Sequence, residues 1–488
     1  MNPIPVPTFL AVDFWALGAI LALGAGALLL LLLELVPARP ESGRAAWISL
    51  LSIAAGAWAV FRVRDAKRAL FDGMFVHDGF GVFFTLLFMG IAAVTVLLSW
   101  DYVKRTRINH AEYYALLLAA TMGMIVMATS NDLITIFLGL ELMSLALYVL
   151  VGIRRNRLDS NEASMKYFLL GAFASGFLLY GIALLYGATG TTNLGRMAVF
   201  LADSPLLGNP LLLTGSLLLL TGFAFKVALV PFHMWAPDAY EGAPTTVTGY
   251  MSVGAKAAGF AALLRVVLLA LPALQADWKP ILSVLAILTM TVGNVTALLQ
   301  NNLKRMLAYS SIAHAGYVLV ALVAGGSDGA AAALFYLAAY SLMNLGAFGL
   351  LALLGKGADE RVLIADLAGL GFRQPFLALA LTVFMLSLGG IPPTAGFMGK
   401  LYVFSVAVKA HLVPLAIVGV LNSVVAIFYY LRVTVAMYMQ EPQGEPVPVS
   451  WALPAVVGVV TALLLTLWWG VQGQALLEIA QRSVLGML

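Results

Sequence analysis

Long apolar runs separated by short polar stretches dominate this chain of 488 residues. A helix that crosses a bilayer needs about 20 mainly apolar residues, and runs of that length recur along almost the whole chain. We count about fourteen of them, near residues 14–36, 45–62, 78–99, 112–130, 132–152, 163–187, 210–232, 244–271, 279–300, 303–324, 328–354, 375–408, 411–439 and 450–471. The pattern predicts an all-α polytopic membrane protein with short connections. A weakly amphipathic tail follows, which either lies on the membrane surface or extends the last helix.

The composition supports this fold class and narrows the chemistry. The chain is 62% hydrophobic and only 10% charged, whereas a soluble domain carries roughly 25% charged residues. It contains no cysteine, so we expect neither disulfides nor thiolate metal or iron–sulfur sites. The five histidines are scattered without metal-binding spacing. We therefore expect no cofactor and no metal on this chain.

Basic residues in the connections predict the orientation, because short cytoplasmic loops are enriched in Lys and Arg. The odd-numbered connections hold most of them: Arg39, Arg44, Lys104, Arg105, Arg107, Arg154, Arg155, Arg157, Lys304, Arg305, Lys356, Arg361 and Arg373. The even-numbered connections hold Arg62, Arg64, Lys67, Arg68, Arg196, Lys279 and Lys409. This bias predicts that both termini face away from the cytoplasm, which for the inner membrane of a bacterial cell is the periplasm, although the basic second connection favours the opposite orientation.

Four ionisable side chains lie inside predicted spans rather than at their ends: Glu141, Lys226, Lys256 and Lys400. A charge at a helix centre costs roughly 2.5–3.5 kcal/mol on insertion scales, so the four together cost on the order of 10 kcal/mol. A cost of this size calls for a specific reason to keep them.

Three interpretations compete. The lysines could reach the interface with their long stems, but Lys256 lies about 18 Å into its span at about 1.5 Å per residue. A structural ion pair between Glu141 and Lys226 would leave two lysines unexplained. The third interpretation is a proton path. Burial disfavours the charged form of a lysine and a nearby carboxylate favours it, so such a lysine gains or loses its proton when its surroundings change.

Polar side chains in adjacent spans are suitable for holding water along such a path. His314 is the most informative of them, because an imidazole exchanges protons near neutral pH, although a single histidine in a membrane is also commonly structural. The others are Thr245, Thr246, Thr248, Tyr250, Asn294, Gln300, Tyr309, Ser310, Ser311, Asn344 and Asn422.

Helix-breaking residues interrupt two of the lysine-bearing spans. Pro231 and Pro237 lie in "LVPFHMWAP", and "SLGGIPPTAGFMGKLY" contains two glycines and two prolines before Lys400. In a bilayer, the backbone groups freed by such breaks must meet protein or water. The breaks fall five spans apart, in the seventh and twelfth.

Because five is an odd number, this spacing predicts two inverted five-helix repeats, each with a proline-broken helix. The predicted divisions are N-terminal helices at 1–110, a first repeat at 111–272, a second repeat at 273–440, and a C-terminal helix and tail at 441–488.

Long strings around these residues resemble a known family. They are "GLELMSLALYVL", "EASMKYFLLGAFASG", "FKVALVPFHMWAPDAYEGAPTTVTGYMS", "KRMLAYSSIAHAGY" and "GGIPPTAGFMGK". They resemble the antiporter-like membrane subunits of the proton-pumping NADH:quinone oxidoreductase, respiratory complex I, over residues 80–435 approximately. Within that family they are most similar to the N-type chains, which are like mitochondrial subunit two.

The resemblance implies roles for individual residues. Glu141 is expected to pair with Lys226 in one half-channel. Lys256 is expected to connect the two halves along a central axis, with His314 nearby. Lys400 is expected to release the proton in the second half-channel.

The resemblance also marks a residue that spacing alone would leave as a span-end charge, namely Lys166 in "EASMKYFLL". Lysine at position 400 favours an N-type chain over the sister chain M, which carries a carboxylate there. The lack of a long lateral helix favours it over chain L.

The family implies that this chain is one subunit of a translocating enzyme and carries no redox centre itself. NADH, FMN, iron–sulfur clusters and quinone are expected on other subunits. The expected partners are the other membrane-arm subunits, including chain M and small subunits such as chain K, together with the lipid bilayer and no nucleic acid. The alternative is a membrane subunit of an Mrp-type sodium/proton antiporter, which needs no NADH. A solute transporter would need a substrate-specific polar cluster, which the sequence does not show.

Overall fold

The computed structural model describes residues 10–35, 43–202, 205–355, 360, 362–442 and 448–487. The N-terminal part contains α1 (Ala11–Ala16), α2 (Gly18–Glu34), α3 (Arg44–Arg62), β1 (Arg68–Leu70), β2 (Phe75–His77) and α4 (Gly79–Arg105). The next stretch contains α5 (Ala111–Thr129), α6 (Leu133–Val151), α7 (Leu158–Thr189), α8 (Leu194–Ala202), η1 (Pro205–Gly208), α9 (Pro210–Lys226), α10 (Trp235–Gly242), α11 (Thr245–Arg265) and the π-helical η2 (Val266–Ala270).

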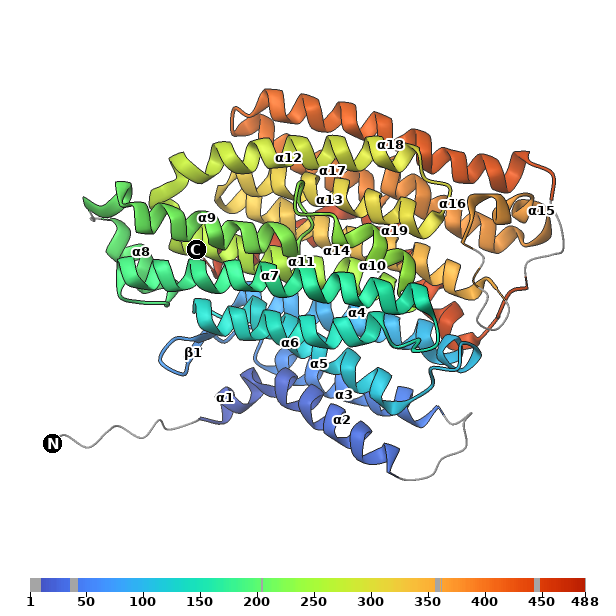
Figure 1. Cartoon of the computed structure of the whole chain (residues 1–488), viewed down its shortest axis with the longest axis horizontal. Helices are drawn as coiled ribbons and strands as arrows, with labels where there is room; N and C mark the ends of the chain where they lie inside the picture. Colours follow the sequence, from blue (N-terminus) through green and yellow to red (C-terminus); the bar gives the residue numbers. More distant parts are fainter. Residues whose placement is uncertain are drawn as a thin grey trace.

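The second half of the chain is also helical. It contains η3 (Pro272–Leu274), α12 (Gln275–Leu298), α13 (Leu303–Ala324), α14 (Gly326–Leu353), η4 (Ile364–Leu367), α15 (Leu370–Arg373), α16 (Pro375–Gly389), α17 (Ala395–Lys409), α18 (Val413–Met439), α19 (Leu453–Val471) and α20 (Gly473–Leu485). The helices lie side by side and run mainly across the view of Figure 1.

Within the described ranges, 11 helices are long and apolar enough to cross a membrane. Three further apolar helices, α2, α9 and α16, are shorter. Each predicted span overlaps one of these fourteen, and the predicted span 375–408 also includes α17. The prediction of an all-α polytopic membrane protein is therefore confirmed. The tail forms α20 as a separate helix, which packs on α14 and α4, so it neither extends α19 nor lies free of the other helices.

The connections gather at two ends of the helices according to their odd or even number. At the end that carries β1 and α8 (Figure 1), Arg196 pairs with Asp72 at 3.0 Å, which joins the sixth and second connections. At the opposite end, Arg105 donates to Gly355 O at 3.1 Å, which joins the third and eleventh. Arg39, Lys356 and Arg361 lie outside the described residues, and the direction in which each end faces stays a prediction.

The second connection contains a β-hairpin, which the hydrophobic pattern did not predict. Its strands are antiparallel with Arg68 opposite His77. Three consecutive turn residues, Phe71, Asp72 and Gly73, have positive φ angles of 54°, 55° and 79°. Four residues, Phe71–Met74, separate the paired residues Leu70 and Phe75, and the three left-handed residues among them let the chain reverse its direction within this loop. Part of the basic charge of this connection therefore lies on a compact hairpin.

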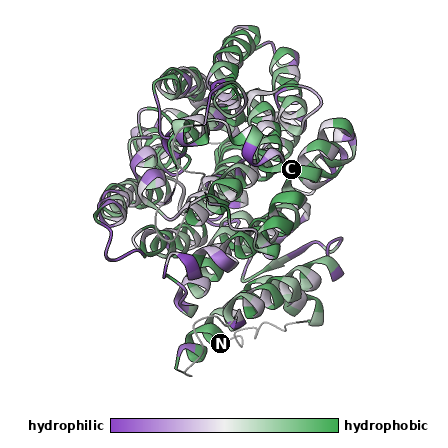
Figure 2. Ribbon diagram, turned by 90° about the vertical axis from the view of Figure 1, so that its right-hand side faces the viewer, coloured by the Kyte–Doolittle hydropathy of each residue, from purple (hydrophilic) through white to green (hydrophobic). Residues whose placement is uncertain are grey.

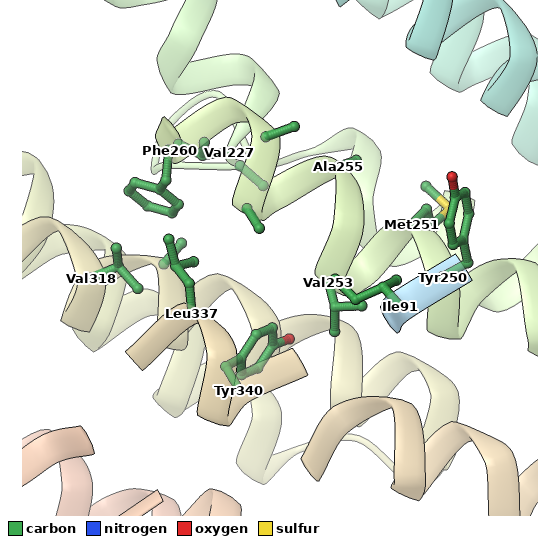
Figure 3. Close-up of a cluster of buried hydrophobic side chains, with 14 of the residues drawn as sticks. Ile91, Val227, Tyr250, Met251, Val253, Ala255, Phe260, Val318, Leu337 and Tyr340 are labelled. Atoms are coloured by element: carbon green, nitrogen blue, oxygen red, sulfur yellow. The ribbon is translucent and has the colours of Figure 1, made fainter. Parts of the chain in front are cut away.

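Three helices form the centre of the molecule. α11, α13 and α14 are buried along almost their whole length, whereas α7 and α19 expose much of their apolar surface. Figure 2 shows the same molecule with its helices predominantly green, which indicates apolar residues on the outside as well as within. Figure 3 shows part of the core, where Ile91, Phe260, Val318 and Leu337 come from α4, α11, α13 and α14. Helices that are apolar all round are those expected at the centre of a membrane protein.

Glycines allow two helix pairs to approach closely. A Cβ on Gly123 of α5 would lie 2.6 Å from Gly139 O of α6. A Cβ on Gly293 of α12 would lie 2.7 Å from Ala313 N of α13. Small residues at such crossings let membrane helices pack backbone to backbone. These are the first helix pairs of the two predicted five-helix repeats, whose boundaries stay a prediction.

Candidate functional site

The first helix break lies where the sequence predicted it. α9 ends at Lys226 and α10 begins at Trp235, so Pro231 lies in a non-helical segment. The backbone groups freed by the break find protein partners. Trp235 Nε1 donates to Phe225 O at 3.0 Å, and Val230 N donates to the Thr289 hydroxyl at 3.0 Å. The break is therefore stabilised from inside the helix bundle and needs no contact with lipid.

Lys226, at the C-terminal end of α9, is held inside the protein. Its side chain is only 3% exposed, and Nζ donates to the Ser144 hydroxyl of α6 at 2.9 Å. A Cβ on Gly259 of α11 would lie 3.4 Å from Lys226 Cγ. The glycine therefore lets the lysine stem lie directly against α11.

Glu141 contributes to this site in a less direct way than predicted. It forms no direct ion pair with Lys226; its Oε1 instead accepts a hydrogen bond from Ser175 of α7. A cavity of ≈ 10 Å³ is lined by Ser144, Ser175 and Lys226, and one water needs about 10–15 Å³. Since Glu141 precedes Ser144 by about one turn of α6, the carboxylate and the lysine are joined through hydroxyls and a space of roughly one water.

Lys256 lies in the middle of the most buried helices. It is 2% exposed, and its Nζ donates to the backbone carbonyl of Ser311 in α13. Gly259, against which the Lys226 stem lies, follows Lys256 by about one turn of α11. Lys226 of α9 thus contacts α11 about one turn from Lys256, which belongs to α11 itself.

His314 lies one turn after Ser311 on α13, inside a shell of tyrosines. Its Nδ1 is 2.8 Å from the Tyr336 hydroxyl and its Nε2 is 3.2 Å from the Tyr430 hydroxyl. Tyr430 also shares a hydrogen bond with Ser310. Because hydroxyl and imidazole groups both donate and accept, this cluster forms an unbroken hydrogen-bonded set from Ser310 to Tyr336.

The second helix break holds Lys400. α16 ends at Gly389 and α17 begins at Ala395, which confirms the predicted interruption. Lys400 Nζ donates to Leu388 O at 3.1 Å, to Gly389 O at 2.9 Å and to the Ser423 hydroxyl at 2.7 Å. The last carbonyls of a helix carry partial negative charge, so the end of α16 is a suitable partner for an ammonium group.

Gly390 makes this arrangement possible. Its φ is +86°, and a Cβ there would lie 2.8 Å from Lys400 Cδ. Any L-residue with a side chain would meet both backbone strain and the lysine.

An aromatic and amide cluster continues from Lys400. The ammonium lies 4.9 Å from the centroid of the Tyr317 ring. The Tyr317 hydroxyl accepts from Asn294 Nδ2 at 3.2 Å, and the Tyr429 hydroxyl donates to Asn294 Oδ1 at 3.0 Å. Tyr429 neighbours Tyr430 in α18, with ring centroids 4.4 Å apart. Polar groups therefore extend from Lys400 to the cluster around His314.

The three lysines that the sequence placed inside spans do not reach the membrane interface. Lys226, Lys256 and Lys400 are 3%, 2% and 4% exposed, and each amine is hydrogen-bonded within the protein. The alternative in which their stems extend to lipid headgroups is excluded by these positions.

Lys166 is placed apart from the buried row. Its amine pairs with Glu162 at 2.7 Å and Asp238 at 2.9 Å, and its side chain is 45% exposed. Asp238 also pairs with Arg305 at 2.8 Å. A polar cavity of ≈ 370 Å³ lies between this surface network and Glu360, at the odd-numbered end. Lys166 thus lines this cavity, on its exposed side.

The structure contains two charged clusters that the sequence analysis did not predict. The first is a fully buried pair: both terminal nitrogens of Arg265 donate to Asp78 at 2.8 Å. Arg265 lies inside the predicted span 244–271, so its depth was a usable signal. Asp78 also accepts from Gly81 N at the start of α4, and it therefore joins α4 to α11.

Glu360 is the centre of the second cluster. Arg154, Lys304, Tyr102 and Thr245 all donate to its carboxylate. Burial alone raises the pKa of Glu360, but the charges of Lys304 and Arg154 and the two hydroxyl donors outweigh it, so the pKa lies below its ordinary value. No periodic pattern marks a single carboxylate in a connection, so nothing in the sequence pointed to this cluster.

Comparisons with known proteins identify the family of this chain. The family described as NADH:quinone oxidoreductase/Mrp antiporter, TM, matches residues 130–426, which include every buried lysine described above. The chain is 50% identical over 459 residues to NADH-quinone oxidoreductase subunit N of Trichlorobacter lovleyi, with 94% of each chain covered. It is 49% identical over 426 residues to NADH-quinone oxidoreductase subunit N 2 of Roseiflexus castenholzii, with 85% of each covered.

A solved structure shows the same architecture. A chain of respiratory complex I from Thermus thermophilus with bound aureothin is 38% identical, with a TM-score of 0.81 over 94% of this chain and 98% of that chain. The residues that the family matches, 130–426, include both helix breaks and the helices between them.

Proposed function

The chain belongs to the NADH:quinone oxidoreductase/Mrp antiporter family of membrane subunits, and from this premise we propose that it is the N-type proton-translocating subunit of NADH:quinone oxidoreductase. Its two subunit-N relatives are about half identical to it across most of both chains. The observation that carries the proposal is the row of three buried lysines, each hydrogen-bonded inside the helix bundle. The electron-transfer chemistry of the enzyme belongs to other subunits in this proposal.

The proposed proton path begins at the odd-numbered end, where the polar cavity beside Lys304 and Glu360 opens. Glu141 governs Lys226 through Ser175 and the space of about one water. When the carboxylate moves or changes charge, Lys226 holds its proton more or less strongly.

From Lys226 the proton moves to Lys256 along α11. The contact of the Lys226 stem with Gly259 places this side chain of α9 about one turn of α11 away from Lys256. Lys256 is bonded to Ser311, and the hydroxyls and imidazole around His314 follow on the same helix.

The proton then reaches Lys400 through the cluster of tyrosines and asparagines, and leaves at the even-numbered end. Tyr317 and Asn294 lie between the His314 cluster and the Lys400 amine. The carbonyls of the broken helix favour the protonated lysine until a change at Lys256 displaces the proton. Each step transfers one proton between a donor and an acceptor, and no electron moves on this chain.

We propose the bacterial inner membrane as its location, with both termini in the periplasm. The proposed partners are the other membrane-arm subunits, including sister chain M and small subunits such as chain K. No metal cluster of three or more His, Asp or Glu side chains occurs among the described residues.

A second candidate is a subunit of an Mrp-type sodium/proton antiporter. A chain of the Mrp complex from Dietzia sp. DQ12-45-1b has a TM-score of 0.85 at 21% identity, with 98% of this chain and 97% of that chain covered, which supports a shared fold alone. Purifying the complex through a tag on this chain separates the two functions. Flavin and iron–sulfur subunits with NADH-driven proton transport would support the oxidoreductase, and a purely membranous complex that exchanges sodium for protons would support the antiporter.

A further inference from the structure

A large apolar groove lies along the helix bundle and shares no lining residue with the cavity at Lys226. It has a volume of ≈ 850 Å³ and runs between α4, α14, α19 and α20. Its wall along α4 extends from Gly79 to Leu97, which is about 27 Å of helix at about 1.5 Å per residue. The groove therefore follows the helices across most of the thickness of a bilayer.

Charged residues line this groove at one end only. They are Arg64, Asp65 and Arg482, which lie beside the start of α4 at the even-numbered end. Arg482 is exposed and forms no ion pair or hydrogen bond with another residue in the described part of the chain. Arg64 contacts Asp65 at 3.5 Å, where both side chains are largely exposed. The polar end thus has one excess positive charge and a guanidinium without a protein partner.

The interior of the groove is kept open by a glycine. Gly90 lies in α4, about 16 Å of helix from Gly79 at the polar end of the groove. A Cβ at this position would meet no atom within 4 Å. Glycine weakens a helix relative to alanine. Helix packing does not require a glycine at position 90, because no atom lies close to it, so the space beside it is open to another molecule.

We propose that this groove binds an anionic phospholipid of the surrounding membrane, with the phosphate at Arg64 and Arg482 and the acyl chains along α4. One polar end and a long apolar interior match the shape and charge of a lipid. Guanidinium groups bind phosphate in a bidentate manner, and Trp469 in the groove wall is typical of a headgroup-level aromatic.

The test is lipid retention by the intact purified complex, measured by native mass spectrometry after exchange into detergent containing phosphatidylglycerol or phosphatidylcholine. Arg482→Gln removes the headgroup contact, and Gly90→Phe fills the groove where no atom stands in the way. Lys409→Gln removes an exposed cation at the same end but outside the groove, and serves as the matched control.

We expect phosphatidylglycerol to be retained in preference to phosphatidylcholine. Its occupancy should fall about fivefold in Arg482→Gln, as for one basic residue at a membrane surface. It should be lost in Gly90→Phe and remain unchanged in Lys409→Gln. Equal retention of both lipids or unchanged retention in Gly90→Phe would overturn the proposal. A cross-link between the thiol of a Gly90→Cys variant and another subunit would also overturn it, because the groove would then hold a protein partner.

Discussion

The two helix breaks hold their lysines in different ways. At the first break, Lys226 is bonded to the hydroxyl of Ser144, and a carboxylate lies about one turn away on the same helix. At the second break, Lys400 is bonded to two helix-terminal carbonyls and one hydroxyl, with an aromatic ring beneath it. The carboxylate near Lys226 can change its charge, whereas the two backbone carbonyls that hold Lys400 are fixed dipoles.

This difference suggests a division of roles between the breaks. A carboxylate that moves or takes up a proton changes the electrostatic potential at its lysine, so the first break is suited to control. Backbone carbonyls of a rigid helix end provide a constant potential, so the second break is suited to holding and releasing a proton that arrives from elsewhere.

The largest effect is expected when the lysine at either break loses its ability to release a proton. Lys226→Arg and Lys400→Arg keep the charge, but arginine stays protonated in proteins. Proton transport in inverted membrane vesicles should fall by about 100-fold or more, or about 2.7 kcal/mol in barrier. NADH oxidation with a water-soluble acceptor serves as the assembly control. Near-normal transport in either assembled variant would contradict a path through that lysine.

A smaller effect, on stability, is expected at the Glu360 cluster. This cluster adjoins the first break, because Lys304 donates both to Glu360 and to Ala243 O just after α10. Glu360→Gln should lower the free energy of unfolding by about 2 kcal/mol at neutral pH, as for other buried hydrogen bonds to charged groups. Because the pKa of Glu360 is lowered on folding, its stabilisation is present above the ordinary value of 4.5 and is lost as the pH falls below it.

Thermal unfolding of the purified complex from pH 7 to pH 3.5 measures this effect. The gap between wild type and Glu360→Gln should narrow below about pH 4.5. A constant gap over the whole range would show that the carboxylate charge is not what stabilises the cluster.

Glu141→Gln tests the control role directly. The amide still accepts a hydrogen bond from Ser175 but cannot change charge, so transport should fall about tenfold, which is about 1.4 kcal/mol. Glu141→Asp keeps the charge and provides the matched control, with partial recovery expected. Full activity in the glutamine variant would remove the distinction between the two breaks.

The smallest effect is expected from Ser423→Ala at the second break. Lys400 keeps both carbonyl partners when this hydroxyl is lost, so we expect about a fivefold loss of transport, or about 1 kcal/mol. Ser144→Ala removes the only protein hydrogen bond described for the Lys226 amine and should cost more. The reverse order of the two serine variants would indicate that the fixed carbonyls do not hold Lys400.

Sequence reasoning located the lysines and both breaks because depth in a span and helix-breaking residues are local properties. It could not reveal that Ser175 of α7 bonds Glu141, or that Lys226 lies on Ser144, since these contacts depend on how helices rotate against each other. The same limit applies to Asp78 and Arg265, which lie far apart in the chain and meet only when α4 packs on α11. The hairpin at residues 68–77 is too short for its alternation to stand out.

Lys256 provides the most direct test, because it is the junction between the two breaks. The ratio of protons moved to NADH oxidised should be measured in reconstituted vesicles containing the Lys256→Met complex. If protons pass through the buried lysines one after another, this ratio will fall while NADH oxidation with a water-soluble acceptor stays unchanged. An unaltered ratio in a fully assembled Lys256→Met complex would contradict the account.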